Sequence, residues 1–118
     1  MVKTKSVYDA VEPGDGDRIL VTRYWPRGMS RDRMSAEWVQ TLAPSRALLN
    51  DWKSNRIDWK EYTDRYHAEM QEQKDSMGEL ARRSQDGTIT LLCFEREGDP
   101  HCHRHLLAKL IERRLQHL

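Results

Sequence analysis

The sequence has little of what marks secreted, fibrous or membrane-spanning proteins. Its 118 residues include two cysteines, four prolines and six glycines, which argues against a disulfide-rich scaffold and a low-complexity chain. Apolar runs are short: none approaches the roughly 20 residues of a membrane-spanning helix, and the first residues lack the apolar stretch of a secretion signal. We therefore expect a cytoplasmic protein with no membrane partner.

A dominant charge of one sign is lacking too. Lysine and arginine number 20 against 19 aspartate and glutamate, so the net charge near +1 gives no general attraction to nucleic acids or anionic membranes. What the chain does have is apolar residues, 37% of the total, gathered in periodic runs that favour a folded domain over disorder. Its length fits one domain, residues 1–118, and no internal repeat is visible.

Three runs of the sequence have the composition of β-strands: Val2–Tyr8, Arg18–Arg23 and Thr88–Phe94. The last two are the most apolar, so we expect them to be neighbours at the centre of a sheet. The segment Ser35–Leu42 fits a short strand and a helical turn equally well. Strands separated by helices predict an α/β fold, a single layered domain with a small central, mostly parallel sheet flanked by helices.

Helix signals lie between these strands. Ser45 is placed to cap a helix running to about Lys53, and Asp58 caps the clearest helix of the chain. This second helix carries an inward stripe at spacings of three and four residues, formed by Trp59, Tyr62, Tyr66 and Met70. Glycine is unfavourable inside helices, so a break is expected between Asp75 and Gly78.

The last helix collects reactive side chains at its start. Asp99 is a good N-cap and Pro100 a favoured first helical residue, which puts Cys102 at the third position. There the helix dipole and the neighbouring Arg104 favour a thiolate. The alternative is that Cys102 is a small apolar residue packed under the helix.

The same segment offers further groups for catalysis. Cys102 or Cys93 is the candidate nucleophile or redox group, and His103 or Glu95 the candidate proton carrier. The cysteines and histidines here do not follow the paired spacing of structural zinc sites, and residues 101, 103 and 105 point to different sides of a helix. We therefore predict no bound metal ion, and no cofactor is indicated.

Arginines follow the second predicted strand. Arg23 and Arg27 should come within reach of the segment from Glu95 to Arg104, because α/β folds collect ligands outside the carboxyl ends of their strands. Such a site suits phosphate or carboxylate, whereas the alternative is that these arginines pair with acidic residues of the protein itself. The candidate binding residues are Arg23, Arg27, Arg104 and Trp25. An interaction of this arginine-rich run with nucleic acid is disfavoured by the balanced charge.

Four segments together resemble the YeaO-like branch of the domain-of-unknown-function 488 family. They are Ser6-Val7-Tyr8-Asp9, the run from Asp17 to Trp25-Pro26-Arg27-Gly28, Glu37-Trp38 with Leu42-Ala43-Pro44-Ser45, and Gly87 to Leu92. The ending, Cys93, Glu95 and Cys102-His103-Arg104, is similar to the longer branch of the family instead, and Thr22 stands where aspartate is usual. The resemblance implies an α/β fold in a bacterial or archaeal cytoplasm and no settled activity.

Two hypotheses follow for function. The first is an enzyme or ligand-binding domain that recognises a small anionic or nucleotide-like molecule in a pocket of arginine, cysteine and histidine. The second is a non-catalytic module that binds protein or nucleic acid. The sequence leaves open the oligomeric state and whether Cys93 and Cys102 form a disulfide.

Overall fold

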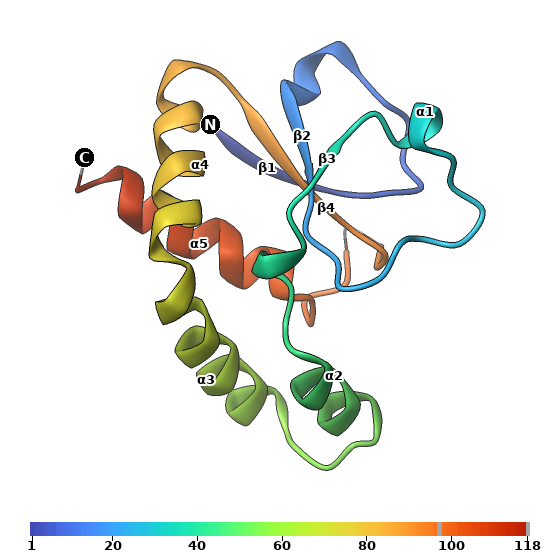
Figure 1. Cartoon of the computed structure of the whole chain (residues 1–118), viewed down its shortest axis with the longest axis vertical. Coiled ribbons are helices and arrows are strands. Elements are labelled where there is room, and N and C mark those ends of the chain that lie inside the picture. Colours follow the sequence, from blue (N-terminus) through green and yellow to red (C-terminus); the bar gives the residue numbers. More distant parts are fainter. Residues whose placement is uncertain (97, 118) are drawn as a thin grey trace.

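The chain folds around a parallel β-sheet. The computed structural model describes residues 1–96 and 98–117 and contains a sheet of four strands in the order β1 (Val2–Ser6), β4 (Ile89–Cys93), β2 (Asp17–Leu20) and β3 (Glu37–Trp38). Every pairing is parallel. The prediction of an α/β fold with two apolar central strands is confirmed, since β4 and β2 are neighbours inside the sheet (Figure 1).

Helices fill the connections between the strands. They are α1 (Arg31–Met34), α2 (Arg46–Lys53), α3 (Trp59–Met70), α4 (Lys74–Asp86) and α5 (His103–Leu115), with short 3₁₀ turns at Pro13–Asp15, Gln40–Leu42 and Gln71–Gln73. The predicted caps are confirmed, because the Ser45 and Asp58 side chains accept hydrogen bonds from the first turns of α2 and α3. The undecided segment 35–42 contains both a strand, β3, and a helical turn.

The predicted helix break near Gly78 is wrong. The interruption falls earlier, at Gln71–Gln73, and α4 runs without a break from Lys74 to Asp86. Gly78 is buried where α4 packs on α5, with the side chain of Arg114 close by. Close packing between the two helices offsets the low helix propensity of glycine, which is a weak preference of about 1 kcal/mol.

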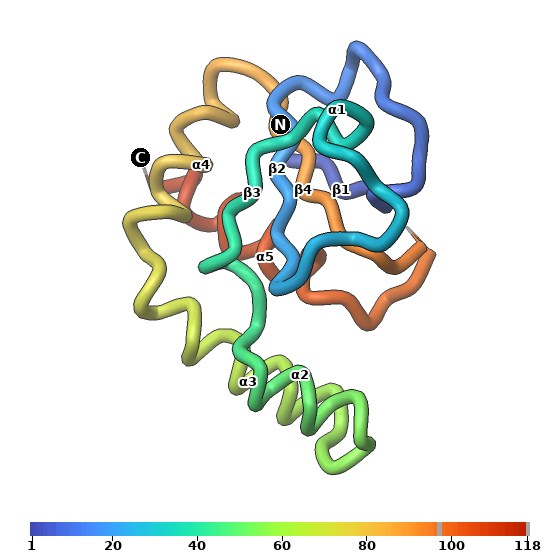
Figure 2. The backbone as a smooth tube through the Cα atoms, turned by 45° about the vertical axis from the view of Figure 1, so that its right-hand side comes forward, coloured from blue at the N-terminus to red at the C-terminus, as the bar shows by residue number. Residues whose placement is uncertain are grey.

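The two faces of the sheet are covered differently. Side chains alternate along each strand: Ile19 and Leu91 face the helices and join the larger apolar core, whereas Leu20 and Leu92 face the opposite side. Helices α4 and α5 cover the first face, and the long connections that carry α1 cover the second (Figures 1 and 2). The helix face is therefore apolar, and the loop face is closed by irregular chain.

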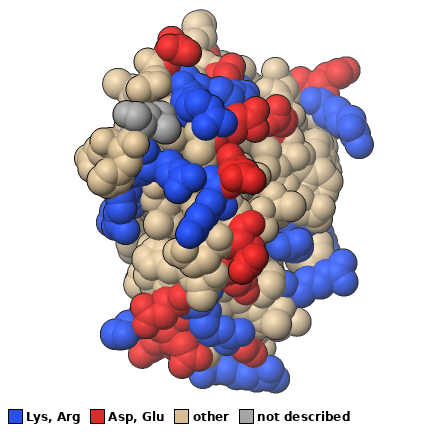
Figure 3. Space-filling view, turned by 60° about the vertical axis from the view of Figure 1, so that its left-hand side comes forward, with Lys and Arg blue, Asp and Glu red and all other residues tan. Residues whose placement is uncertain are grey.

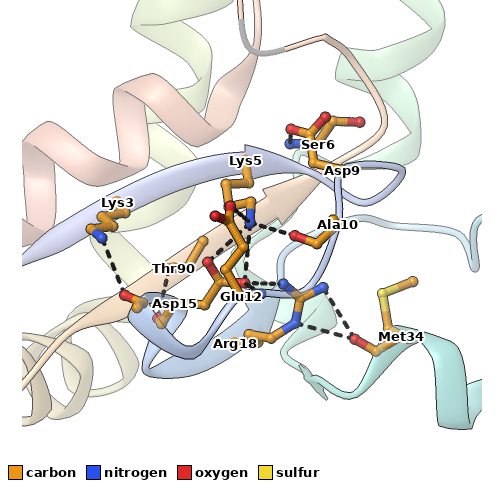
Figure 4. A network of polar contacts seen from close by, with 11 residues as sticks. Lys3, Lys5, Ser6, Asp9, Ala10, Glu12, Asp15, Arg18, Met34 and Thr90 are labelled. Atoms are coloured by element: carbon orange, nitrogen blue, oxygen red, sulfur yellow. Dashed lines mark hydrogen bonds and ion pairs between the residues drawn. The ribbon is translucent and has the colours of Figure 1, made fainter.

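A buried group of charges, here called the ion cluster, supports that irregular chain. It consists of Lys5, Asp15 and Arg18 (Figure 4). Lys5 Nζ lies 3.0 Å from Asp15 Oδ1, Arg18 donates to the other carboxylate oxygen, and Arg18 also donates to the Met34 carbonyl at 3.3 Å. Burial raises the pKa of Asp15, but the hydrogen bonds from its partners outweigh it, so that pKa lies below its ordinary value.

Gly16 permits the loop to close over this cluster. Its φ angle is 62°, in the left-handed region that residues other than glycine rarely adopt. A Cβ atom here would stand 2.1 Å from the carbonyl oxygen of Thr88. The next residue back, Asp15, accepts a hydrogen bond on its own carbonyl from Thr90 at 2.7 Å, which ties the loop to strand β4.

Surface charge is mixed. On the face shown in Figure 3, lysine and arginine lie interleaved with aspartate and glutamate, as the nearly balanced composition of 20 against 19 indicates. Among the described residues, no helix is long and apolar enough to cross a membrane.

Candidate functional site

A pocket opens at the carboxyl edge of the sheet. It lies beside the ends of β2 and β4, with α2 and α3 as one wall and the start of α5 as another. The space open to water-sized molecules is about 180 Å³. Its lining includes Arg23, Trp52, Tyr62 and a group of four reactive residues, here called the thiol cluster: Cys93, Glu95, Cys102 and His103. The sequence placed the site at this edge, and the structure brings those four residues together there.

The start of α5 differs from the sequence prediction. Asp99 does not cap the helix and Pro100 is not its first residue, because α5 begins at His103 and Cys102 is its N-cap. The Asp99 carboxylate instead accepts a hydrogen bond from the His101 backbone in the preceding loop, at 2.9 Å. Cys102 has extended backbone angles (φ −134°, ψ 138°), and its sulfur lies beside the end of β4 rather than inside the helix.

The two thiols meet at one carboxylate oxygen. Cys93 is the last residue of β4, and its Sγ lies 2.9 Å from Glu95 Oε2. Cys102 Sγ lies 3.2 Å from the same oxygen. Both cysteines are buried and free of any disulfide. The last residue of β4 and the N-cap of α5 thus both contact Glu95, which lies in the turn after the strand.

His103 is held in one orientation by the backbone. Its Nε2 lies 2.6 Å from the carbonyl oxygen of Val21, and a carbonyl oxygen only accepts hydrogen bonds. Nε2 therefore carries a proton, and in the neutral ring the free electron pair lies on Nδ1. Nδ1 lies 4.0 Å from Cys93 Sγ, so His103 presents a base to the thiol cluster.

Proton affinities within the thiol cluster are uneven. A hydrogen bond from Cys93 does most to lower the pKa of the Cys102 thiol, against the effect of burial, and with His103 it brings that pKa to about 6. The same contact with Cys102, together with burial, raises the pKa of Cys93 well above its ordinary value. The nearby Glu95 charge opposes a thiolate at Cys102 but is the smallest contribution. Of the two thiols, Cys102 is therefore the more acidic.

Glu95 is the acidic partner of both sulfurs. Burial raises its pKa, yet the hydrogen bonds from Cys93 and Cys102 outweigh burial and hold the pKa below its ordinary value. Glu95 is thus a carboxylate when the thiols donate to it.

Arg104 does not line the pocket. It is fully buried, and its guanidinium donates to the backbone carbonyls of Lys5, Glu95 and Arg96 at 3.2, 2.8 and 2.7 Å. Two of these carbonyls belong to the turn that carries Glu95. Arg104 therefore supports the turn of the thiol cluster from the side away from the pocket. The sequence analysis had instead placed Arg104 among the candidate ligand-binding residues.

The other predicted binding residues divide between two hollows. Arg23 lines the pocket with the thiol cluster and is anchored by hydrogen bonds to the carbonyls of Ala43 and Pro44. Arg27 and Trp25 lie instead in an adjoining shallower hollow. Of the two arginines predicted to reach the segment Glu95–Arg104, Arg23 thus shares a pocket with part of that segment, and Arg27 does not.

Helices α2 and α3 contribute residues that sequence reasoning missed. Trp52, Lys53 and Tyr62 line the pocket, although only Tyr62 belonged to the predicted aromatic stripe, and that stripe was assigned to the core. The stripe is inward-facing as predicted, with Tyr62 and Tyr66 buried and Trp59 partly buried. Tyr62 within this stripe also lines the pocket, a consequence of helix placement that no local pattern signals.

The thiol cluster also has donor atoms suited to a metal ion. One ligand atom each from Cys93, Cys102 and His103 lie within 4.8 Å of one another. Thiolate and imidazole ligands suit zinc. Sequence reasoning about spacing did not foresee this convergence. The two sulfurs also contact Glu95 Oε2, and the absence of a metal ion stays a prediction.

Comparison with known proteins assigns the family. A family model described as "Active DUF488-N3 subclade" matches residues 2–115. The chain belongs to the DUF488 family. The resemblance inferred from the sequence is thereby confirmed, and the description of this DUF488 subclade as active is consistent with a catalytic role for the pocket.

Similar DUF488 proteins come from several bacteria. "Uncharacterized protein YeaO" of Escherichia coli is 33% identical over 92 residues, which are 77% of this chain and 80% of that protein. "Uncharacterized protein Rv3073c" of Mycobacterium tuberculosis is 29% identical over 114 residues, covering 96% of this chain and 95% of that one. No solved structure matches the chain.

Proposed function

We propose that this DUF488 protein is an enzyme that uses Cys102 as a nucleophile on a small anionic molecule. One observation carries the proposal: Cys102, Cys93, Glu95 and His103 line a single pocket that also has cationic side chains. A nucleophilic thiol needs a lowered pKa, a neighbouring proton carrier and access to a ligand. The thiol cluster supplies the first two and the pocket the third.

The chemistry is a transfer through a thiol adduct. The Cys102 thiolate attacks an electrophilic atom of the ligand, a new bond forms to sulfur, and the leaving group departs with its electron pair. A proton from the Cys93 thiol neutralises the leaving group. Water then attacks the adduct, gives up a proton to the cluster and releases Cys102, so that the overall reaction is hydrolysis.

Cations at the pocket account for an anionic ligand. Arg23 lines it, with two of its guanidinium nitrogens held by backbone carbonyls, so the group is fixed in place. Lys53 is exposed at the end of α2 and lines the same pocket. Fixed guanidinium and mobile ammonium groups both favour phosphate or carboxylate.

The non-catalytic alternative is less well supported. An exposed aromatic stripe on α3 would have favoured it, but Tyr62 and Tyr66 are 3% and 0% exposed. Their rings stack on each other within the core, with centroids 6.5 Å apart. These two rings stabilise the fold and are not displayed as a binding platform.

Alkylation by iodoacetamide tests the proposal. Cys93→Ser keeps a hydrogen-bond donor beside Cys102 and removes the other thiol. We expect native Cys93→Ser to be alkylated at Cys102 with a rate that rises with pH around 6 and then levels off, because only the thiolate reacts. Cys102→Ser should stay unreactive below the ordinary thiol range near pH 8.5.

Two results would overturn the proposal. One is a Cys93→Ser protein that reacts only in denaturant, which would make Cys102 a packing residue. The other is stoichiometric zinc retained by the purified protein through dialysis, with alkylation appearing only after a chelator is added. That result would make the thiol cluster a metal centre.

A further inference from the structure

A second hollow adjoins the reactive pocket and has a different character. It is lined by four aromatic residues and two cations: Tyr8, Tyr24, Trp25, Phe94, Arg27 and Lys53. Its space open to water-sized molecules is about 380 Å³. We propose that this aromatic hollow binds the planar ring of the ligand whose reactive group enters the thiol pocket, and that the ligand is a nucleoside monophosphate. Only the placement of the reactive group in the thiol pocket rests on the proposed function; the binding of the ring does not.

Aromatic side chains are gathered here at the surface. Tyr8 is 57% exposed, Tyr24 47% and Phe94 36%, and they are among the most exposed large apolar side chains of the protein. Single exposed apolar residues need no explanation, whereas a group around one hollow marks a binding surface. Aromatic faces stack with every nucleobase.

Hydrogen bonds hold two rings of the aromatic hollow in place. The Tyr8 hydroxyl donates to the Arg27 carbonyl at 3.2 Å, and the Trp25 indole donates to the Met29 carbonyl at 2.6 Å. The Thr22 hydroxyl donates to the Tyr24 carbonyl at 2.7 Å, which holds the Tyr24 backbone. Because the Tyr8 and Trp25 rings are fixed beforehand, they lose little conformational entropy when a ligand binds, which favours affinity.

The cations of the hollow are available to an anion. Within the described part of the chain, the side chains of Arg27 and Lys53 form no hydrogen bond or ion pair, and both residues are exposed. This differs from Arg23, whose guanidinium is held by two carbonyls. A phosphate group has the charge and acceptor oxygens that unpaired guanidinium and ammonium groups bind.

The two sites are continuous. Tyr24, Lys53 and Phe94 line both the aromatic hollow and the thiol pocket. Phe94 directly follows Cys93, so one stacking ring and one sulfur of the thiol cluster leave the end of strand β4 at adjacent positions. A single ligand that carries a ring, a phosphate and an electrophilic atom can therefore contact the aromatic, cationic and thiol groups at once.

Calorimetric titration of the full chain tests the inference. The probes are the four 5′ ribonucleoside monophosphates, adenosine and inorganic phosphate. We expect at least one monophosphate to bind about tenfold more tightly than either adenosine or phosphate alone, because it uses both stacking and charge. Tyr24→Ala and Phe94→Ala should each weaken that binding about tenfold or more, and Tyr24→Phe should restore it, since phenylalanine keeps the ring.

Matched controls lie outside both sites. Val11→Ala removes another exposed apolar side chain and Lys109→Gln another exposed lysine, and neither should change nucleotide affinity. Lys53→Gln should weaken monophosphates but not adenosine. The inference is wrong if no monophosphate binds more tightly than phosphate, if the alanine variants bind normally, or if a single-stranded hexanucleotide binds far more tightly than every mononucleotide.

Failure of the two proposals can be told apart. Alkylation of Cys102 in the Tyr24→Ala variant measures the thiol independently of the ring. A reactive Cys102 in a protein that binds no monophosphate would overturn the aromatic hollow alone. Tight monophosphate binding by a protein whose Cys102 is unreactive would support the aromatic hollow and overturn the thiol chemistry.

Discussion

The protein contains two buried groups of ionisable side chains, one toward the start of strand β4 and the other at its end. In the ion cluster, the oxygens of Asp15 accept from Lys5, from Arg18 and from the Glu12 backbone, and Arg18 also reaches a backbone carbonyl. In the thiol cluster, one oxygen of Glu95 is shared by two sulfurs, and the group lines a pocket.

The difference shows what buried charge means in this fold. Lys5 and Arg18 neutralise the charge of Asp15, so its carboxylate is satisfied within the protein. The ion cluster therefore holds the loops on that face of the sheet in place. The thiol cluster has two similar acids with unequal pKa values beside a space for a ligand. Burial is common to both, and only the unequal proton affinity and the open pocket indicate chemistry.

Gly16→Ala should have the largest effect, because it removes the bend that closes the ion cluster. The new Cβ would meet the Thr88 carbonyl at 2.1 Å, and φ is positive there. We expect the free energy of unfolding to fall by about 4 kcal/mol. Urea unfolding measures it. Gly87→Ala, where nothing lies near the new Cβ, should change stability by less than about 1 kcal/mol.

Asp15→Asn should follow, with a loss of about 3 kcal/mol, since the buried Arg18 loses its carboxylate partner and Lys5 keeps only Glu12. Because the pKa of Asp15 is lowered in the folded state, its stabilisation is present above about pH 4 and is lost as pH falls below that value. The gap between wild type and Asp15→Asn should therefore close in acid.

Arg104→Lys should cost about 2 kcal/mol, because one ammonium group cannot serve the Lys5, Glu95 and Arg96 carbonyls together. The variant should also slow alkylation of Cys102 at pH 7, since the turn that carries Glu95 loses its support. Arg113→Lys, on the exposed side of α5, serves as the control. Unchanged alkylation would show that Arg104 supports the fold and not the thiol cluster.

Cys102→Ala should have the smallest effect on stability, about 1 kcal/mol, while it abolishes alkylation of the native protein below pH 8. Measured together by urea unfolding and mass spectrometry, these two results would separate reactivity from stability in the thiol cluster. A loss as large as that of Asp15→Asn would mean that both clusters are structural.

Much of the fold is predictable from local sequence. The apolar runs 19–22 and 89–92 identified the central strands, and Ser45 and Asp58 identified helix starts, because alternation and capping act within a few residues. The start of α5 was misplaced for a related reason: Asp99 and Pro100 have the composition of a helix start, but the loop uses Asp99 for a turn.

The candidate site was predictable in its members and not in its geometry. Cys93, Glu95, Cys102 and His103 were recognised from their chemistry and their place after a strand, and Arg23 from its place after a neighbouring strand. Arg104 was misassigned because nothing in the sequence shows that its guanidinium is buried against backbone carbonyls. Trp52 and Lys53 were missed because they reach the site only through the packing of α2 beside α3.

The sequence by itself determined the class of fold, since this follows from residue type, periodicity and order along the chain, and its motifs carried the resemblance to the family. Only the tertiary structure decided that two thiols share one carboxylate oxygen, that Val21 sets the proton on His103, and that Arg27 lies apart from the thiol cluster. The physical reason is that these contacts form only where the ends of strands, a turn and the start of a helix are packed together, and hydrogen-bond geometry is set only after packing brings the groups within about 3 Å.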